Sequence, residues 1–124
     1  LSACGASAPT PEAKASYTVV EVSDVSFGAT IRKSVRLAMD ETVTKEEIEW
    51  IAHDIVKQTT KQQPVNAIGI FMYTRGADYS GLASVCVDWA PYGDWGQANE
   101  IKTGDYKYHQ YHYRAQGSRY DYWK

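Results

Sequence analysis

The sequence TKEEIEWIAHDIVKQTTKQ, residues 44–62, decides the fold because it carries the strongest helix signals in the chain. Thr44 and Glu47 have the spacing of a capping box, in which each side chain accepts a hydrogen bond from the other residue's backbone N–H. Pro64 prevents the helix from continuing far beyond Gln62. We therefore predict one amphipathic helix, whose apolar face repeats at helical spacing through Ile48, Ile51, Ala52, Ile55, Val56 and Thr59.

Runs with strand character lie on both sides of this helix. Residues 17–25 are β-branched and aromatic, and residues 30–39 alternate between an apolar-rich face and a polar face, which indicates a half-buried strand. The turn-forming residues 26–29 lie between the two runs and predict a β-hairpin. After the helix, residues 66–74 and 82–90 are again β-rich, and the glycine-containing loop between them predicts a second hairpin.

The order strand, strand, helix, strand, strand predicts an α+β fold. We expect an antiparallel sheet of about four strands, with the amphipathic helix packed on one face and an aromatic C-terminal extension. The chain has 124 residues, of which 44% are hydrophobic and 23% are charged, as is usual for one small globular domain. The formal net charge of -2 argues against a general nucleic-acid binder, so we expect no nucleic-acid partner.

The first residues, Leu1-Ser2-Ala3-Cys4, resemble the lipobox of bacterial lipoproteins, in which an aliphatic residue and two small residues precede the acylated cysteine. Residues 5–16 have no large apolar side chain and suit a flexible tether. The resemblance implies a signal peptide upstream of Leu1 and lipidation of Cys4, which would anchor the domain to a membrane without a spanning helix. Because Gly5 and not Asp follows the cysteine, the resemblance also implies the outer membrane, with the domain facing the periplasm.

A second resemblance covers most of the chain. The capped helix, the strand NAIGIFMY, the run DWAPYGDW and the later TGDY together resemble a small bacterial and phage domain of unknown function. Its most distinctive part is Gly93-Asp94-Trp95 together with Gly104-Asp105-Tyr106. The resemblance implies the α+β architecture and no particular chemistry. We assign residues 1–16 to the lipobox and tether, residues 17–114 to one α+β domain and residues 115–124 to a C-terminal tail.

Motifs for catalysis are missing from the sequence. It has no nucleophile elbow, no phosphate-binding loop and no H-E-x-x-H metal motif, so we predict neither an enzyme nor a cofactor. On a helix, the spacing of His109 and His112 would place both imidazoles on one side, where Asp105 could complete a metal site. The segment is rich in tyrosine and lacks helix signals, so we favour a strand or loop, and a strand places the two histidines on opposite faces. We interpret four acids as solvated loop residues: Asp88, Asp94, Glu100 and Asp105.

The last third of the chain is dense in aromatic residues. Tyrosine and tryptophan combine apolar area with a polar group, so they are enriched in protein interfaces and also stack on sugar rings. One interpretation is that half of these rings close the core and the rest form a tail. The functional interpretation is a partner-binding surface made of Tyr92, Trp95, Tyr106, Tyr108, Tyr111 and Tyr113.

Together these features predict a membrane-anchored bacterial lipoprotein. Its small periplasmic or surface domain would make protein–protein contacts in an envelope or surface assembly, without enzymatic activity. One alternative is a glycan- or peptidoglycan-binding module that uses the same rings, and another is a phage or plasmid accessory lipoprotein that acts at the cell surface. An enzyme would need two carboxylates brought together in a pocket. Self-association by strand addition at an exposed sheet edge also remains open.

Overall fold

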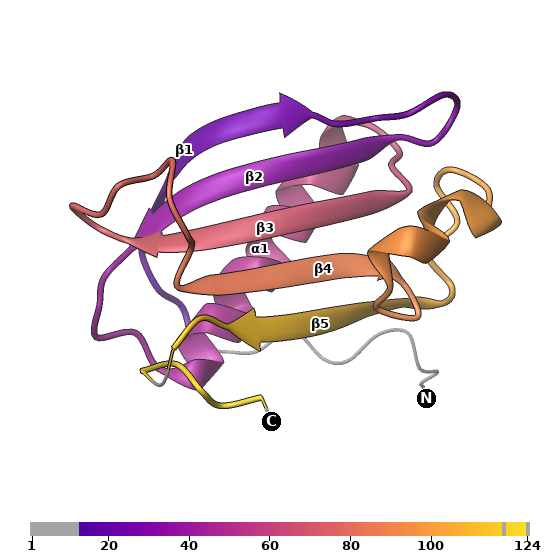
Figure 1. Cartoon of the computed structure of the whole chain (residues 1–124). Coiled ribbons are helices and arrows are strands. Elements are labelled where there is room, and N and C mark those ends of the chain that lie inside the picture. Colours follow the sequence, from indigo (N-terminus) through magenta and orange to yellow (C-terminus); the bar gives the residue numbers. More distant parts are fainter. Residues whose placement is uncertain (1–12, 118, 124) are drawn as a thin grey trace.

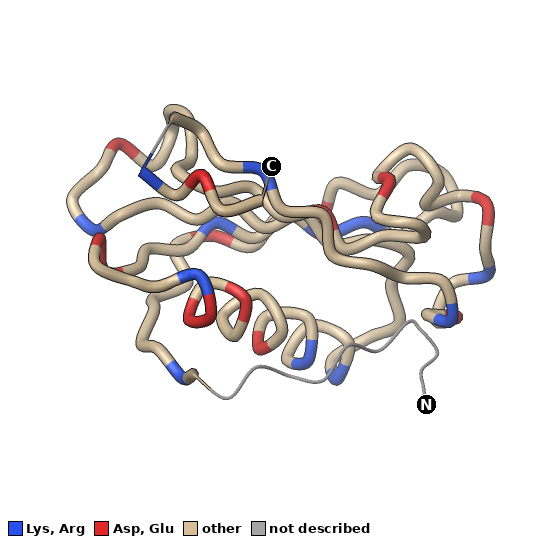
Figure 2. The backbone as a smooth tube through the Cα atoms, turned by 90° about the horizontal axis from the view of Figure 1, so that it is seen from below, with Lys and Arg blue, Asp and Glu red and all other residues tan. Residues whose placement is uncertain are grey.

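A five-stranded sheet and one long helix form the protein in the computed structural model, which describes residues 13–117 and 119–123 (Figure 1). The helix α1 lies behind one face of the sheet, and the short 3-10 helix η1 lies on the other side, at one end of β4 (Figure 1). Seen from below, the sheet and α1 form two separate layers (Figure 2). In chain order the elements are β1 Tyr17–Asp24, β2 Arg32–Met39, α1 Lys45–Gln62, β3 Ala67–Thr74, β4 Val85–Pro91, η1 Trp95–Glu100 and β5 His109–Ala115.

The predicted helix is confirmed, together with its capping box. The Thr44 hydroxyl accepts the backbone N–H of Glu47 at 3.1 Å, and the Glu47 carboxylate accepts that of Thr44 at 2.8 Å. At the other end, the backbone N–H of Gln63 donates to the Thr59 carbonyl, and the helix ends at Gln62. The buried residues of α1 all belong to the predicted apolar face: Ile48, Ile51, Ala52, Ile55 and Val56.

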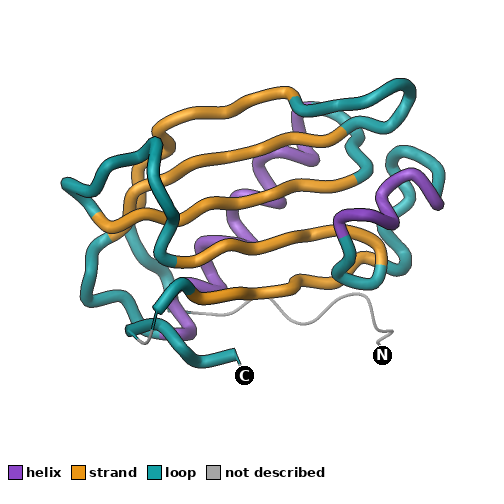
Figure 3. Tube along the Cα trace, viewed as in Figure 1, coloured by secondary structure: helices purple, strands orange, loops and turns teal. Residues whose placement is uncertain are grey.

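The strands lie in the order β1-β2-β3-β4-β5, so that neighbours along the chain are also neighbours in the sheet (Figure 3). The α+β class and the packing of one helix on the sheet are confirmed. The sheet differs from the expectation in being mixed, because β2 and β3 run parallel while the other three pairs are antiparallel. The reason is that α1 carries the chain from the end of β2 back to the edge where β2 began, and such a crossover joins parallel strands.

The sheet has five strands rather than about four, because the tyrosine-rich segment after η1 pairs along its whole length with β4. This agrees with our preference for a strand or loop over a helix there. The C-terminal residues also pack onto the domain. Tyr120 is buried and donates its hydroxyl to the Glu41 carbonyl at 2.7 Å, and the Trp123 indole donates to the Glu49 carboxylate at 3.0 Å.

The core lies between α1 and the facing side of the sheet. In β2 the predicted alternation is confirmed: Val35, Leu37 and Met39 are buried in the core, whereas Arg36 faces the other side, over the Phe71 ring. Strands β3 and β4 supply the rest of the central core with Ile68, Ile70, Met72, Val85, Val87 and Trp89.

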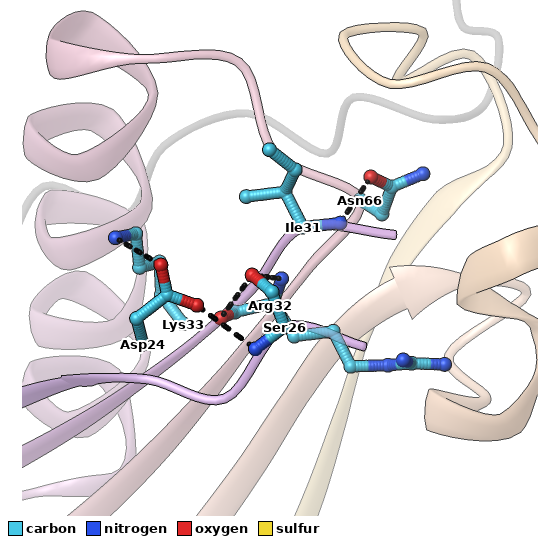
Figure 4. Close-up of polar contacts among 6 residues, drawn as sticks. All are labelled: Asp24, Ser26, Ile31, Arg32, Lys33 and Asn66. Carbon is cyan, nitrogen blue, oxygen red and sulfur yellow. Dashed lines mark hydrogen bonds and ion pairs between the residues drawn. The ribbon is translucent and has the colours of Figure 1, made fainter. Parts of the chain in front are cut away.

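One buried amide, that of Asn66, joins the start of β3 to three other parts of the chain. Its side-chain oxygen accepts the Ile31 backbone N–H at 2.8 Å (Figure 4). The same oxygen accepts the Thr103 hydroxyl at 2.8 Å. Its side-chain nitrogen donates to the carbonyls of Ala98 at 3.1 Å and Ile101 at 3.2 Å. The entry to β2, the helix η1 and the loop after it are therefore held together by one side chain.

The first prediction concerns this amide. Asn66→Ala should lower the free energy of unfolding by about 3 kcal/mol, because the substitution leaves buried backbone groups without hydrogen-bond partners. Urea unfolding followed by circular dichroism measures the change. Asn99→Ala is the matched control, because Asn99 is exposed on η1, and it should change stability by less than about 0.5 kcal/mol. Equal effects of the two substitutions would contradict the role given to Asn66.

Candidate functional site

Among the described residues, η1 and the loop after β3 cover the two ends of the sheet face that α1 leaves open. At one end, Ala98 of η1 packs against Ala67 and Ala90. At the other end, the loop after β3 covers Tyr73, whose buried hydroxyl donates to the Gly81 carbonyl at 2.9 Å. The middle of this face, between η1 and the loop after β3, is left open.

A hollow of about 430 Å³ occupies this middle region, and we call it the sheet hollow. The Trp95 indole forms one side of it and can lie on β3 because Gly69 has no side chain. A Cβ atom at position 69 would meet Trp95 at 3.3 Å, a distance tighter than an ordinary contact. The position of this ring therefore depends on a glycine that is distant in sequence. The lining residues are Val25, Ser34, Gly69, Phe71, Asp88, Trp95 and Arg114.

A second hollow of about 490 Å³, the turn hollow, adjoins the first and shares Asp88 and Trp95 with it. It is built by the turn after β4, where Gly93 has a φ of 71° and Tyr92 a φ of 59°. A positive φ is uncommon for a residue with a side chain, and such conformations cluster at turns and at functional sites. The Asp94 carboxylate caps η1 by accepting the Gly96 backbone N–H at 2.9 Å. The other lining residues are Gln110, Tyr111 and His112.

Charged groups surround the point where the two hollows meet. Asp88 pairs with Arg114, with 3.1 Å between nitrogen and oxygen. Burial raises the pKa of the Asp88 carboxyl, Arg114 and His112 oppose this rise, and Asp94 adds to it. The Arg32 guanidinium lies 5.7 Å from the centre of the Trp95 ring. The uncovered face therefore combines aromatic rings with guanidinium groups.

The structure separates the six predicted contact residues into two groups, three on the uncovered side of the sheet and three that pack against the core. Tyr92 and Tyr108 are 56% and 45% exposed and stack on each other, with 5.5 Å between ring centroids. Trp95 lines both hollows. The other three rings lie against the core: the Tyr106 hydroxyl accepts the Val65 N–H at 3.1 Å, Tyr111 stacks on His53 and Tyr113 stacks on Trp123.

Sequence reasoning missed several residues of the uncovered face. Ser34 belongs to the polar face that was predicted for its strand, so the alternation in residues 30–39 contained part of the signal. Gly69 and Phe71 line the hollow only because β3 is the central strand, which no local pattern indicates. Arg114 reaches Asp88 across the β4–β5 pair.

His109 and His112 lie on opposite faces of β5, as the strand spacing predicted: His109 is 1% exposed and His112 is exposed and lines the turn hollow. Among the described residues, no group of three or more His, Cys, Asp or Glu side chains could hold a metal ion. Of the loop acids, Asp105 accepts the Lys107 backbone N–H at 3.1 Å, and Glu100 is exposed. For Asp88 the expectation of a solvated loop residue is wrong, because Asp88 lies within β4 and pairs with Arg114. Asp88 and Asp94 line the same hollow.

No protein-family model, curated protein or solved structure matches this chain. Cys4, the predicted lipidation site, lies outside the described residues. Within the described part of the chain, no helix has the length and apolar character needed to cross a membrane. The geometry of the uncovered face therefore carries the functional argument.

The buried imidazole of His109 gives a prediction about pH. Its Nε2 lies 2.8 Å from the Asn66 carbonyl oxygen and so carries the proton, while Nδ1 is buried without a hydrogen-bond partner. Burial lowers the pKa of His109, and the hydrogen bond to Asn66 and the charge of Asp105 only partly offset this effect. The unfolded chain therefore binds a proton at His109 more readily than the folded protein does. Neutral His109 contributes fully to stability above about pH 6.5, and this contribution is lost as the pH falls below that value.

His109→Gln should therefore reduce the fall in melting temperature between about pH 7 and about pH 5. Part of the fall should remain, because burial also lowers the pKa of His53. Thermal unfolding across this pH range provides the measurement. His112→Gln is the matched control, because it removes an exposed imidazole from the same strand, and it should change the slope less than His109→Gln does. If both variants showed the wild-type slope, His109 would not be the titrating group.

Proposed function

We propose that this chain is a membrane-anchored bacterial lipoprotein whose domain binds a protein partner in an envelope or surface assembly, without enzymatic activity. The observation that carries the proposal is the junction of two hollows at Trp95, on the sheet face that α1 leaves uncovered. The lipobox resemblance at Cys4 supports the envelope as the compartment.

Two features of this face support protein binding. Tryptophan, tyrosine and arginine dominate the energetics of protein interfaces, and Trp95, Tyr92 and Arg114 line the two hollows. The lining is held in place before a partner arrives, because the Asn66 amide fixes η1 and Gly69 receives the Trp95 ring. Such preorganisation reduces the entropy cost of association.

The carboxylates of the turn hollow support binding over acid–base catalysis. Asp88 is paired with Arg114, and Asp94 is engaged as the cap of η1. Each acid therefore already has a structural partner, whereas a general acid or base must be free to exchange a proton with a substrate.

A second candidate is a glycan- or peptidoglycan-binding module. It is favoured by the Trp95 indole, which has Asp88, Asp94, Gln110 and His112 around it in the turn hollow. An aromatic ring on which a sugar can stack, bordered by polar side chains for its hydroxyl groups, would suit such a ligand. Retention of the protein on purified sacculi, lost in Trp95→Ala, would select this candidate.

The anchoring part of the proposal predicts that Cys4 carries acyl chains. When the precursor is expressed in the native host with an alkyne-labelled fatty acid, Cys4→Ala should lose the label and move from the membrane to the soluble fraction. Cys86→Ala is the matched control, because Cys86 is a free cysteine within strand β4, and it should keep both properties. Label retained in Cys4→Ala would remove the anchor from the proposal.

The binding part predicts where a partner touches the domain. A photo-crosslinking residue at Ser34 or Tyr92 on the uncovered face should give a discrete protein adduct in host membranes. The same residue at the exposed Lys57 of α1 should give none. Trp95→Ala should weaken binding about tenfold or more, as truncation of a central interface residue does.

The outcomes of the cross-linking experiment separate the candidates. An adduct that muramidase digests would replace the protein partner with a glycan. Equal adducts from Lys57 and from the uncovered face would contradict a site at the hollows.

A further inference from the structure

Three guanidinium groups lie in or next to the sheet hollow. Arg114 of β5 lines the hollow, whereas Arg32 and Arg36 belong to β2, on either side of the lining residue Ser34. The Arg36 guanidinium lies 6.0 Å from the centre of the Phe71 ring, while Arg32 lies over Trp95. Phe71 and Trp95 both line the hollow, so Arg32 and Arg36 adjoin its aromatic lining.

The carboxylates of the described residues do not balance these cations. Arg114 is paired with Asp88 and Arg36 with Glu21, whereas Arg32 forms no ion pair with any carboxylate in the described part of the chain. The Arg32 Nε is buried without a hydrogen-bond partner, and the guanidinium lies over the Trp95 ring. A guanidinium that stacks on a ring keeps its outer edge available for an anion.

The apolar part of the lining indicates which kind of anion fits. Val25 and Phe71 lie in the same hollow as the arginine and serine side chains. An occupant that buries apolar area there and also neutralises a guanidinium needs an apolar group next to a carboxylate. A peptide segment with an acidic side chain beside an apolar one meets this requirement, whereas an acidic sugar ring carries hydroxyl groups where the apolar contact would be.

The neighbouring turn hollow has carboxylates and no lysine or arginine among its lining residues. The carboxylates are those of Asp88 and Asp94, and Asp88, which pairs with Arg114, also lines the sheet hollow. A second acidic side chain is repelled there, so the electrostatics direct the acidic part of an occupant towards β2.

We propose that the sheet hollow binds an acidic segment of the partner protein, with a carboxylate at the unpaired Arg32, next to Arg36, and an adjacent apolar side chain against Phe71 and Trp95. This inference rests on the proposed function and adds the chemistry of the partner.

The test uses the full chain labelled with ¹⁵N and three short synthetic peptides. The peptides differ only in the side chains that flank a central phenylalanine: Asp and Glu in one, Asn and Gln in the second, Lys in the third. The acidic peptide should shift the amide signals of Ser34 and Gly69 and the indole signal of Trp95. It should bind at least about fivefold more tightly than the amide peptide, and added salt should weaken its binding.

A pair of double variants controls for net charge. Arg32→Gln with Arg36→Gln should weaken binding of the acidic peptide by at least about fivefold. Lys57→Gln with Lys61→Gln removes the same charge from exposed positions on α1 and should leave binding unchanged. Arg114 is kept in both variants, because its removal would leave the half-buried Asp88 without its counter-ion.

Equal binding of the acidic and amide peptides, or equal effects of the two double variants, would overturn the inference. Tighter binding of an oligogalacturonate than of the acidic peptide would overturn it in favour of an acidic glycan. If cross-links form at Ser34 and Tyr92 while the acidic peptide causes no shifts, the acidic partner is excluded and the binding function stands. If the cross-links are also missing, the proposed function fails together with this inference.

Discussion

The buried amide of Asn66 is the constraint on which the rest of the structure depends. A side-chain amide has two donor hydrogens and an oxygen with two lone pairs, and here both donors and both lone pairs are used. The partners come from the entry to β2 and from η1 with the loop after it, two regions that are far apart in sequence. Because a buried polar network is strong only when every member is satisfied, these segments hold their positions together.

This constraint links the core to the uncovered face. The 3-10 helix that Asn66 holds begins at Trp95, and the Trp95 ring reaches back over β3 to Gly69. One face of the sheet packs against α1 and forms the hydrophobic core, which stabilises the domain. The other face is only partly covered and exposes aromatic rings and guanidinium groups. The aromatic residues serve both faces, because a tyrosine can close a core with its ring and still place its hydroxyl at a polar partner.

The sequence predicted what local signals determine. The helix follows from a capping box and from helical periodicity, and β2 follows from alternation, so both lie close to where they were expected. The direction of β3 relative to β2 depends on how the helix crosses the sheet, and no residue pattern shows that. No residue pattern shows which tyrosines are exposed and which are packed either. Tyr106 and Tyr108 are two residues apart, yet Tyr108 is exposed, whereas Tyr106 packs against the core and its hydroxyl accepts the Val65 N–H. The hollow depends on a contact between Gly69 and Trp95 that only the folded chain brings together.

The parallel pairing of β2 with β3 has a consequence for the order in which the molecule assembles. The β1–β2 hairpin closes a short connection, and hairpins of this kind form on the microsecond timescale. The central pair cannot form until the chain that contains α1 has looped back, which is a contact of long sequence separation. We therefore expect the local strand pairs to form first and the central β2–β3 pair to form late. Asn66 precedes β3, so its hydrogen bond to the entry of β2 can fix the register of this pair only when the two strands meet.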